Sequence, residues 1–340
     1  MKAVAFAGTA KMELREMPQP EPGPGQVLLR VSHCGICGSD LHEYASHGPS
    51  LRAAGLFQPV MGHEFTAIVE AAGEGARLAV GTPVVVHPGG ACGDCYFCNS
   101  GQDNLCADQV GTGYRHQGGY AEYTVVREDQ ALPLPDDSWL EAAALTEPLG
   151  VAMHAVNRGG LQKSESVFIA GGGPIGLLTL LAAKRLGAGL VIVSEPSQAR
   201  RDLALRLGAD HAVDPAKLAS VQAKDATKGI GCDLAIEAVG IAPTMDDCIA
   251  ATRRGGRIVV AGAFEQPYSV NLLVLLVQEQ TLIGTFGYRR EFAEAMRLIT
   301  TGAVDVSPLI SAKVSLEDLP ATFAAITEDR GKYQKVLVTP

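Results

Sequence analysis

The chain has 340 residues, of which 47% are hydrophobic and 19% charged, and its formal net charge is −9. This length suits two domains, the composition excludes disorder, and the negative charge without a basic run argues against nucleic acid as a partner. No secretory signal is evident, and the longest apolar run, Leu272–Val277, is far too short to span a membrane. We therefore expect a cytoplasmic protein whose eight cysteines are thiols or metal ligands.

The first 150 residues predict a domain of short β-strands. Clusters of glycine and proline separate four β-type runs, which are Val27–Val31, Ala67–Glu70, Val84–Val86 and Tyr120–Val126. This pattern is typical of a barrel-like, mostly antiparallel β domain.

Four potential metal ligands are split along this domain: Cys37, His63, Glu64 and Glu147. One thiolate, one imidazole and one or two carboxylates can form a zinc site that keeps a position for water or substrate. Each residue alone is weak evidence, because single buried cysteines and histidines are usually core residues. Cys34 also permits a C-x-x-C redox pair with Cys37, which we discount because such pairs begin a helix and none is predicted here.

A second group of potential ligands is contiguous. Four cysteines lie within residues 92–106, namely Cys92, Cys95, Cys98 and Cys106. Four thiolates at this spacing suit a closed tetrahedral zinc site that organises a loop with little core of its own. Disulfides and an iron–sulfur cluster are the alternatives. A closed site leaves no open coordination position, so we predict a structural role for it.

From about residue 165 the pattern changes to alternating strands and helices. Helix-like segments such as Gly176–Leu186 and Gln198–Leu207 separate six apolar runs. These runs are Val167–Ala170, Leu190–Val193, Ala212–Val213, Leu234–Ile236, Ile258–Ala261 and Leu282–Ile283. They predict an α/β fold with a doubly wound parallel sheet.

The chain then returns to the first domain. A helix is predicted over Glu291–Thr300 and a strand over Lys335–Val338. We therefore place the catalytic domain at residues 1–150 and 288–340 and the nucleotide-binding domain at 151–287.

A G-x-G-x-x-G motif lies where the first of these strands meets the first helix. Gly171 permits a tight turn, Gly173 lets the backbone approach a pyrophosphate, and Gly176 allows close packing of the helix. Pro174 and Ile175 begin the helix, whose N-terminus attracts phosphate. The motif therefore predicts a dinucleotide site, although a purely structural glycine loop is the alternative.

An acidic residue after the next strand bears on the choice of dinucleotide. Glu195 is placed to accept the ribose hydroxyls and to repel a 2′-phosphate, which favours NAD over NADP. Arg200 and Arg201 could instead reach a phosphate or lie on a solvated helix face.

Five segments together make the chain similar to the zinc-containing medium-chain dehydrogenases over essentially its full length. They are CGICGSDLHEY (Cys34–Tyr44), GHE (Gly62–Glu64), the four-cysteine segment, TEPLGVAMHAV (Thr146–Val156) and GGGPIG. The resemblance implies a GroES-like barrel joined to a Rossmann domain. It also implies transfer of a hydride between a secondary alcohol or its ketone and NAD(H), and assembly into homodimers or homotetramers.

The resemblance also implies two bound zinc ions, one catalytic and one structural. Cys37, His63 and Glu64 would hold the catalytic zinc, and Glu147 would bind it directly or through water, as in the polyol branch of the family. Asp40 would orient the histidine. Zinc would then lower the pKa of the alcohol.

Three further residues match functional positions of the family. Ser39 and His42 would relay the alcohol proton to solvent. Lys335 would approach the cofactor pyrophosphate.

The substrate is less closely specified. The HEY and EPL segments most resemble butanediol dehydrogenases and related diol and polyol dehydrogenases, but Gly287 stands where sorbitol dehydrogenases carry an arginine. This difference favours a short vicinal diol, an acyloin or a simple secondary alcohol. Dehydrogenation of L-threonine or sorbitol stays open.

Two readings from other classes also remain: a non-catalytic zinc-stabilised NAD-binding protein and a zinc-free reductase. The ligands that such proteins typically lose are present in this chain.

An apolar segment bears on assembly. Leu272–Val277 reads as a loop between the last two strands of the parallel sheet, and a surface of this kind at a sheet edge needs covering. We expect pairing across a two-fold axis, with an internal helix as the alternative.

Overall fold

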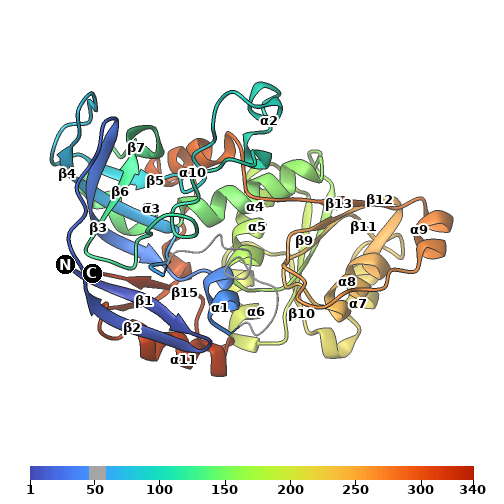
Figure 1. The fold of residues 1–340 in the computed structure, drawn as a ribbon. Coiled ribbons are helices and arrows are strands. Elements are labelled where there is room, and N and C mark those ends of the chain that lie inside the picture. The colour runs from blue at the N-terminus through green and yellow to red at the C-terminus, as the bar shows by residue number, and fades with distance from the viewer. Residues whose placement is uncertain (46–58) are drawn as a thin grey trace. The chain divides into compact units, whose positions relative to one another are not determined.

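The structure is a computed structural model that describes residues 1–45 and 59–340 (Figure 1). The chain forms two compact units, one of residues 1–147 and 292–340 and one of residues 148–291. From the sequence we place the same two transitions at 150/151 and 287/288. Helix α4 (Thr146–Arg158) and helix α10 (Glu291–Thr300) carry the chain across them.

The first unit is built on a mixed seven-stranded sheet. Its strands run in the order β14 (Ile310–Val314), β15 (Lys335–Val338), β3 (Gln26–Gly35), β4 (Glu64–Ala72), β5 (Pro83–Val86) and β7 (Ala131–Pro133), with β6 (Tyr123–Arg127) also paired to β3. Only β14 and β15 pair in parallel. The C-terminal strand β15 thus lies against β3, with Leu337 opposite Gly35.

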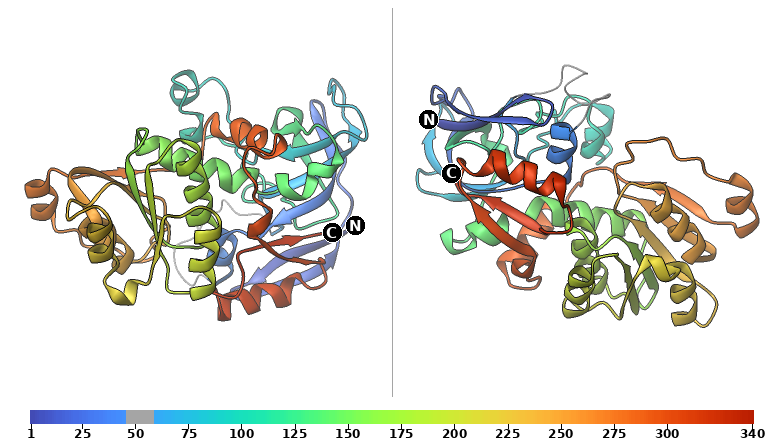
Figure 2. Two further views of the ribbon diagram at one scale, coloured as in Figure 1. Left: turned by 180° about the vertical axis from the view of Figure 1, so that it is seen from behind. Right: turned by 90° about the horizontal axis from the view of Figure 1, so that it is seen from below.

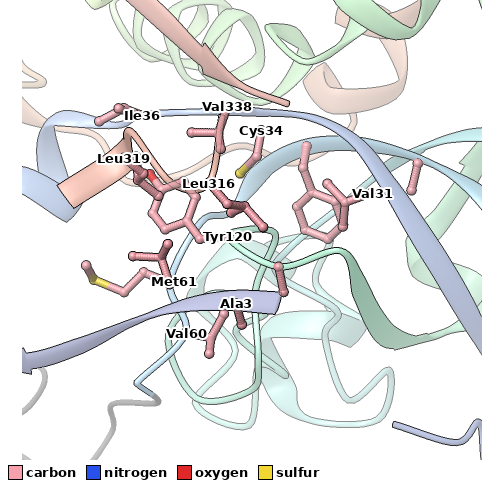
Figure 3. Packing of buried hydrophobic residues seen from close by; sticks show 14 of the residues in the cluster. Ala3, Val31, Cys34, Ile36, Val60, Met61, Tyr120, Leu316, Leu319 and Val338 are labelled. Carbon is pink, nitrogen blue, oxygen red and sulfur yellow. The ribbon is translucent and has the colours of Figure 1, made fainter. Parts of the chain in front are cut away.

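A hairpin and short helices complete this unit. They are β1 (Lys2–Gly8), β2 (Lys11–Glu16), α1 (Gly38–Ala45), α2 (Tyr96–Asn99), α3 (Leu140–Ala143) and α11 (Leu319–Glu328), with 3-10 turns at Asp103–Leu105, Glu128–Gln130, Asp137–Trp139 and Ser307–Leu309. The core draws on both ends of the chain, because Ala3 of β1 and Val338 of β15 lie in one buried cluster with Cys34 and Tyr120 (Figure 3).

Helix α1 differs from the sequence-based expectation. No helix is predicted after Cys37, yet α1 begins at Gly38. Leu41 N donates to Cys37 O at 3.3 Å, and Asp40 Oδ2 accepts from Cys37 N at 3.1 Å, so a carboxylate in the first turn stabilises the start of the helix. The premise on which the redox pair was discounted is therefore wrong.

The second unit contains the predicted parallel sheet. Its six strands run in the order β10 (His211–Val213), β9 (Leu190–Ser194), β8 (Ser166–Ala170), β11 (Cys232–Glu237), β12 (Thr252–Val260) and β13 (Thr281–Gly284). Numbered along this unit, that order is 3-2-1-4-5-6, the arrangement of dinucleotide-binding folds.

Helices pack on both faces of this sheet (Figure 2). They include α5 (Pro174–Arg185), α6 (Gln198–Arg206), α7 (Ala219–Ala226) and α8 (Ala242–Ala251), with a 3-10 turn at Pro215–Lys217. Because both faces are covered, β8, β9 and β11 are almost wholly buried, which explains their continuous apolar sequences.

The segment after β12 also differs from expectation. Leu272–Val277, expected as a loop, lies in helix α9 (Leu272–Gln278), and Asn271 caps it by accepting from Leu273 N at 3.1 Å. The alternative of an internal helix is right about the helix but not about its burial, because four of its apolar residues, Leu272, Leu273, Leu276 and Val277, are exposed. Among the described residues, no helix is long and apolar enough to cross a membrane.

Candidate functional site

Cys37, His63 and Glu64 come together in the first unit. Their ligand atoms all lie within 4.8 Å of one another. Cys37 follows β3 and Glu64 begins β4, and the antiparallel register of these strands sets Gly35 opposite Glu64. His63 and Glu64 are buried, so this donor set is largely removed from water.

Asp40 connects the parts of this cluster. Its Oδ2 accepts from Cys37 N at 3.1 Å and from the Tyr120 hydroxyl at 2.7 Å, and its Oδ1 lies 3.4 Å from His63 Nδ1. Burial disfavours a charged His63, but Asp40 and Cys37 outweigh it and raise the pKa of His63 well above its usual value. With Nδ1 facing Asp40, Nε2 is the ring nitrogen available to a ligand.

Lys335, which the resemblance assigns to the cofactor pyrophosphate, lies buried against Glu64. Its Nζ donates to Glu64 Oε2 at 2.5 Å and to Ile36 O at 3.0 Å, and both side chains are buried. Burial alone would lower the pKa of Lys335, but Glu64 and Cys37 raise it overall. The other Glu64 oxygen, Oε1, is buried without a hydrogen-bond partner among the described residues. Such an atom is costly unless a cation or a donor meets it.

Glu147 lies at the start of α4 and is buried, but it is not part of the group of three. Burial raises the pKa of Glu147 to about 7, and Glu64 and Asp40 act in the same direction, whereas His63 and Lys335 act against them. Glu147 therefore interacts electrostatically with the same cluster.

Tyr114 was not singled out from the sequence. Its hydroxyl lies 2.9 Å from His63 Nε2 and 3.0 Å from Ser39 Oγ. Burial and the negative charges of Cys37 and Asp40 raise the pKa of Tyr114 well above its usual value, so the hydroxyl stays protonated. The only signal in the sequence is the density of glycines between residues 111 and 119.

Ser39 and His42 both lie on α1, three positions apart. Ser39 is exposed and His42 is half-buried. Cys34, in contrast, lies within the apolar core (Figure 3), and burial raises the pKa of its thiol well above the usual value. A buried, protonated thiol is a poor redox nucleophile, and this burial argues against a Cys34–Cys37 redox pair although a helix does follow Cys37.

The four cysteines of residues 92–106 also gather. Sulfur–sulfur distances are 3.5 Å for Cys95–Cys98, 3.5 Å for Cys92–Cys106 and 3.8 Å for Cys92–Cys98. Zinc–sulfur bonds of about 2.3 Å give tetrahedral edges of about 3.8 Å, whereas a disulfide bond is about 2.05 Å long. Desolvation and the neighbouring thiols raise the pKa of Cys98 to about 12. These distances fit a shared cation and not disulfides.

The glycine motif joins β8 to α5 in the second unit. Gly171 has φ +109°, a conformation that favours glycine, and a Cβ on Gly176 would lie 1.9 Å from Gly171 O. Gly173 precedes Pro174, the first residue of α5, and Ile175 follows. A Cβ on Gly173 would meet only Arg200, at 3.9 Å, so this side of the turn is open.

Glu195 follows β9 and lies against the same turn. Its carboxylate oxygens accept from Gly172 N and Ser197 N, both at 2.8 Å. Arg200 Nη1 lies 4.0 Å from Glu195 Oε2, whereas Arg201 donates to the carbonyls of Glu195 and Pro196. Arg200 is therefore the cation nearest to the carboxylate that is expected to select the ribose.

Two family models match the chain. The model described as "Alcohol dehydrogenase GroES-like domain" covers residues 23–136, and "Zinc-binding dehydrogenase" covers residues 174–301. The sorbitol dehydrogenase of Bacillus subtilis is 31% identical over 100% of this chain and 97% of its own length. The (R,R)-butanediol dehydrogenase of Neisseria gonorrhoeae is 32% identical over 100% of this chain and 99% of its own length.

The folds agree as well. A solved structure of a zinc-binding dehydrogenase from Sinorhizobium meliloti bound to NADP is 33% identical, with a TM-score of 0.89 over 100% of this chain and 99% of that one.

Proposed function

The chain belongs to the zinc-containing medium-chain alcohol and polyol dehydrogenases, and we propose that it transfers a hydride between a short vicinal diol, or the matching acyloin, and NAD(H). The chain is thus an oxidoreductase that uses zinc and a nicotinamide cofactor. The observation that carries the proposal is the convergence of Cys37, His63 and Glu64 beside two hydroxyl groups.

The residues of this cluster fit a zinc ion. A thiolate, an imidazole and a carboxylate are typical zinc ligands, and Glu64 Oε1 is buried without a partner among the described residues. We propose that Cys37, His63 and Glu64 hold the catalytic ion and that Glu147 reaches it directly or through water. The chemistry that zinc supplies when bound is polarisation of the alcohol oxygen, which lowers the pKa of the hydroxyl.

The surrounding residues would then position groups and move the proton. Asp40 would keep the imidazole of His63 oriented, and Lys335 would balance the charge of Glu64. In this proposal Ser39 accepts the proton of the alcohol, and His42, one turn further along α1, passes it to solvent.

The structural zinc would sit among Cys92, Cys95, Cys98 and Cys106, where four sulfurs complete the coordination. This arrangement gives the ion no place for a substrate. We also propose a cytoplasmic location, because zinc thiolates need a reducing compartment.

We propose NAD as the preferred dinucleotide, bound by the turn from Gly171 to Gly176. The support is Glu195, a buried carboxylate beside this turn that would repel a 2′-phosphate. Arg200 lies close to Glu195, so the Glu195→Ala variant should accept NADP⁺ more readily than the wild type does. A wild-type preference for NADP⁺ would contradict this assignment.

The experiment that tests the function is a screen of NAD⁺ reduction with diols, polyols, amino-alcohols and simple secondary alcohols. We expect kcat/KM for 2,3-butanediol to exceed that for sorbitol at least tenfold, which is about 1.4 kcal/mol of transition-state binding. The support is Gly287 at the position of the polyol-binding arginine. Gly287 has φ +57°, so an arginine there would be strained by roughly 1–2 kcal/mol. Equal efficiency on both substrates would contradict the proposed substrate.

We further propose a homodimer or homotetramer. Leu272, Leu273, Leu276 and Val277 of α9 are between 59% and 70% exposed, and β13 ends the parallel sheet. A second copy of the chain would cover both the helix and the strand edge. Light scattering at micromolar concentration tests this, and a monomer would contradict it.

A further inference from the structure

Ser39 and Tyr114 present two hydroxyl groups that are one hydrogen bond apart. Ser39 Oγ and Tyr114 Oη are separated by 3.0 Å, and Tyr114 Oη lies 2.9 Å from His63 Nε2. The two residues are 75 positions apart in the sequence and reach this place from α1 and from residues 111–119. The proposed proton path uses Ser39 but gives Tyr114 no role.

The position of Tyr114 is well defined. Its ring packs on the His63 ring with centroids 4.5 Å apart, and its backbone N donates to Gly111 O at 2.9 Å. Glycines on both sides of Tyr114 continue the contact, because Gly119 N donates to Gly62 O at 2.8 Å and a Cβ on Gly113 would lie 2.7 Å from the same oxygen. A tyrosine has few rotatable bonds, so its hydroxyl is held in place at little entropic cost.

The hydrogen bond to His63 also defines where the hydroxyl points. Nε2 is the ring nitrogen that faces away from Asp40, so the hydroxyl lies beside the proposed reacting centre. A ligand that uses the Nε2 lone pair leaves the Tyr114 hydroxyl with Ser39 and with capacity for one further partner.

Two hydroxyls at this spacing match the two hydroxyls of a vicinal diol. When the carbons of a vicinal diol are gauche, its oxygens are also about one hydrogen-bond length apart. We propose that Tyr114 is a specificity-determining residue that binds the second hydroxyl of the diol, or the second oxygen of the acyloin, while Ser39 meets the reacting hydroxyl. This inference rests on the proposed function. A site built to bind a hydroxyl rejects analogues that lack it.

The test is the zinc-loaded Tyr114→Phe variant, which keeps the ring and removes one oxygen. We measure kcat/KM with NAD⁺ for 2,3-butanediol and for 2-butanol, which has the same carbon chain and one hydroxyl. The ratio of diol to mono-alcohol should fall about tenfold or more, while the value for 2-butanol changes less than about threefold. Ser39→Ala, in contrast, should lower both values together.

A readout independent of turnover is the dissociation constant of 2,3-butanediol, measured by calorimetry on the zinc-loaded protein with NADH. It should rise about tenfold in Tyr114→Phe and stay unchanged in Tyr96→Phe, which alters an exposed tyrosine of the four-cysteine segment. Zinc content should equal that of the wild type.

An unchanged ratio in a wild type that oxidises diols would overturn the role of Tyr114 alone. Equal losses on both substrates, or loss of zinc from the variant, would also overturn it, because Tyr114 would then support the reacting centre itself. A wild type that oxidises no vicinal diol would overturn the proposed function together with this inference.

Discussion

The first unit holds two groups of potential metal ligands with opposite construction. The four cysteines of residues 92–106 come from one short segment, and only Cys106 is buried. The other group, which we call the mixed-ligand cluster, consists of Cys37, His63 and Glu64; it draws on separate segments and is mostly buried. One site is thus local and closed, whereas the other depends on how strands pair.

The difference shows in what surrounds each group. Near the four cysteines the described contacts are largely backbone hydrogen bonds within turns, such as the bond from Asn99 N to Cys95 O at 2.9 Å. Around the mixed-ligand cluster, Lys335 makes a buried hydrogen bond to Glu64, and Asp40 makes a partly buried one to Cys37 N. The spacing of the ligands in the sequence can specify a closed site. An open site also needs neighbouring residues that orient its ligands and keep one coordination position free for water or substrate.

The largest effect should come from the mixed-ligand cluster. Cys37→Ser removes a strong ligand, so turnover should fall by roughly a thousandfold or more, because polarisation of the alcohol depends on the ion. Elemental analysis should show one zinc per chain instead of two. The unfolding temperature should change little, and activity within tenfold of the wild type would remove Cys37 from the ligand set.

Cys95→Ser should have the opposite signature. The four-cysteine site contributes directly to folding, so losing one ligand should destabilise the segment by several kcal/mol. Limited proteolysis should then cut within residues 92–106, while turnover measured before cleavage is largely retained. If Cys37→Ser and Cys95→Ser have the same unfolding temperature and are cut by the protease at the same places, the distinction between the two sites is wrong.

These two sites also show how far the sequence reaches. The potential ligands of both groups are predictable as residue types, and the existence of a parallel sheet covered on both faces follows from its continuous apolar runs. The order of its strands is not predicted. Helix α10 (Glu291–Thr300) and strand β15 (Lys335–Val338) have the predicted bounds. Helix α1 is not predicted from the sequence. Its start is stabilised by Asp40, whose carboxylate also accepts from the Tyr120 hydroxyl and faces His63.

Two supporting contacts of the mixed-ligand cluster, those of Lys335 and Tyr114, are hidden from the sequence because they are non-local. Lys335 meets Glu64 across 271 positions, and Tyr114 meets His63 across 51. The first contact follows from the pairing of β15 with β3, and the second from the packing of glycines 113 and 118 on Gly62. Neither leaves a periodic signal in the chain.

The pH dependence of zinc retention should differ between the sites. A thiol must lose its proton to bind zinc, and the pKa of Cys98 is raised to about 12, so binding displaces protons at neutral pH and affinity falls as pH falls. The closed site has four thiols, whereas the mixed-ligand cluster has one thiol and His63, whose pKa is also raised. The closed site therefore displaces about two more protons per ion, and retention should weaken about a hundredfold more steeply per pH unit there.

This slope can be measured with a chromophoric chelator between pH 6.5 and 8.5. Cys37→Ser reports on the closed site alone, and the wild type reports on both sites. Equal slopes would mean that the two sites displace the same number of protons.

The smallest effect concerns the support itself. Asp40→Asn keeps the shape of the side chain but removes the charge that faces His63 Nδ1 at 3.4 Å and weakens the acceptor of Cys37 N. Zinc affinity of the mixed-ligand cluster should fall about 10–100-fold, while the closed site keeps its ion.

The matched control is Asp129→Asn. Asp129 is an exposed carboxylate that pairs with Arg127, and Arg127 in turn donates to Ala91 O beside the four cysteines. We expect no change in either zinc for this control, because a local, all-thiolate site should not depend on a neighbouring carboxylate. Competition with a chelator, read separately for each ion, measures both variants. Two results would contradict this explanation. One is an unchanged zinc affinity at both sites in Asp40→Asn. The other is a loss of affinity at the closed site in Asp129→Asn as large as the loss at the mixed-ligand cluster in Asp40→Asn.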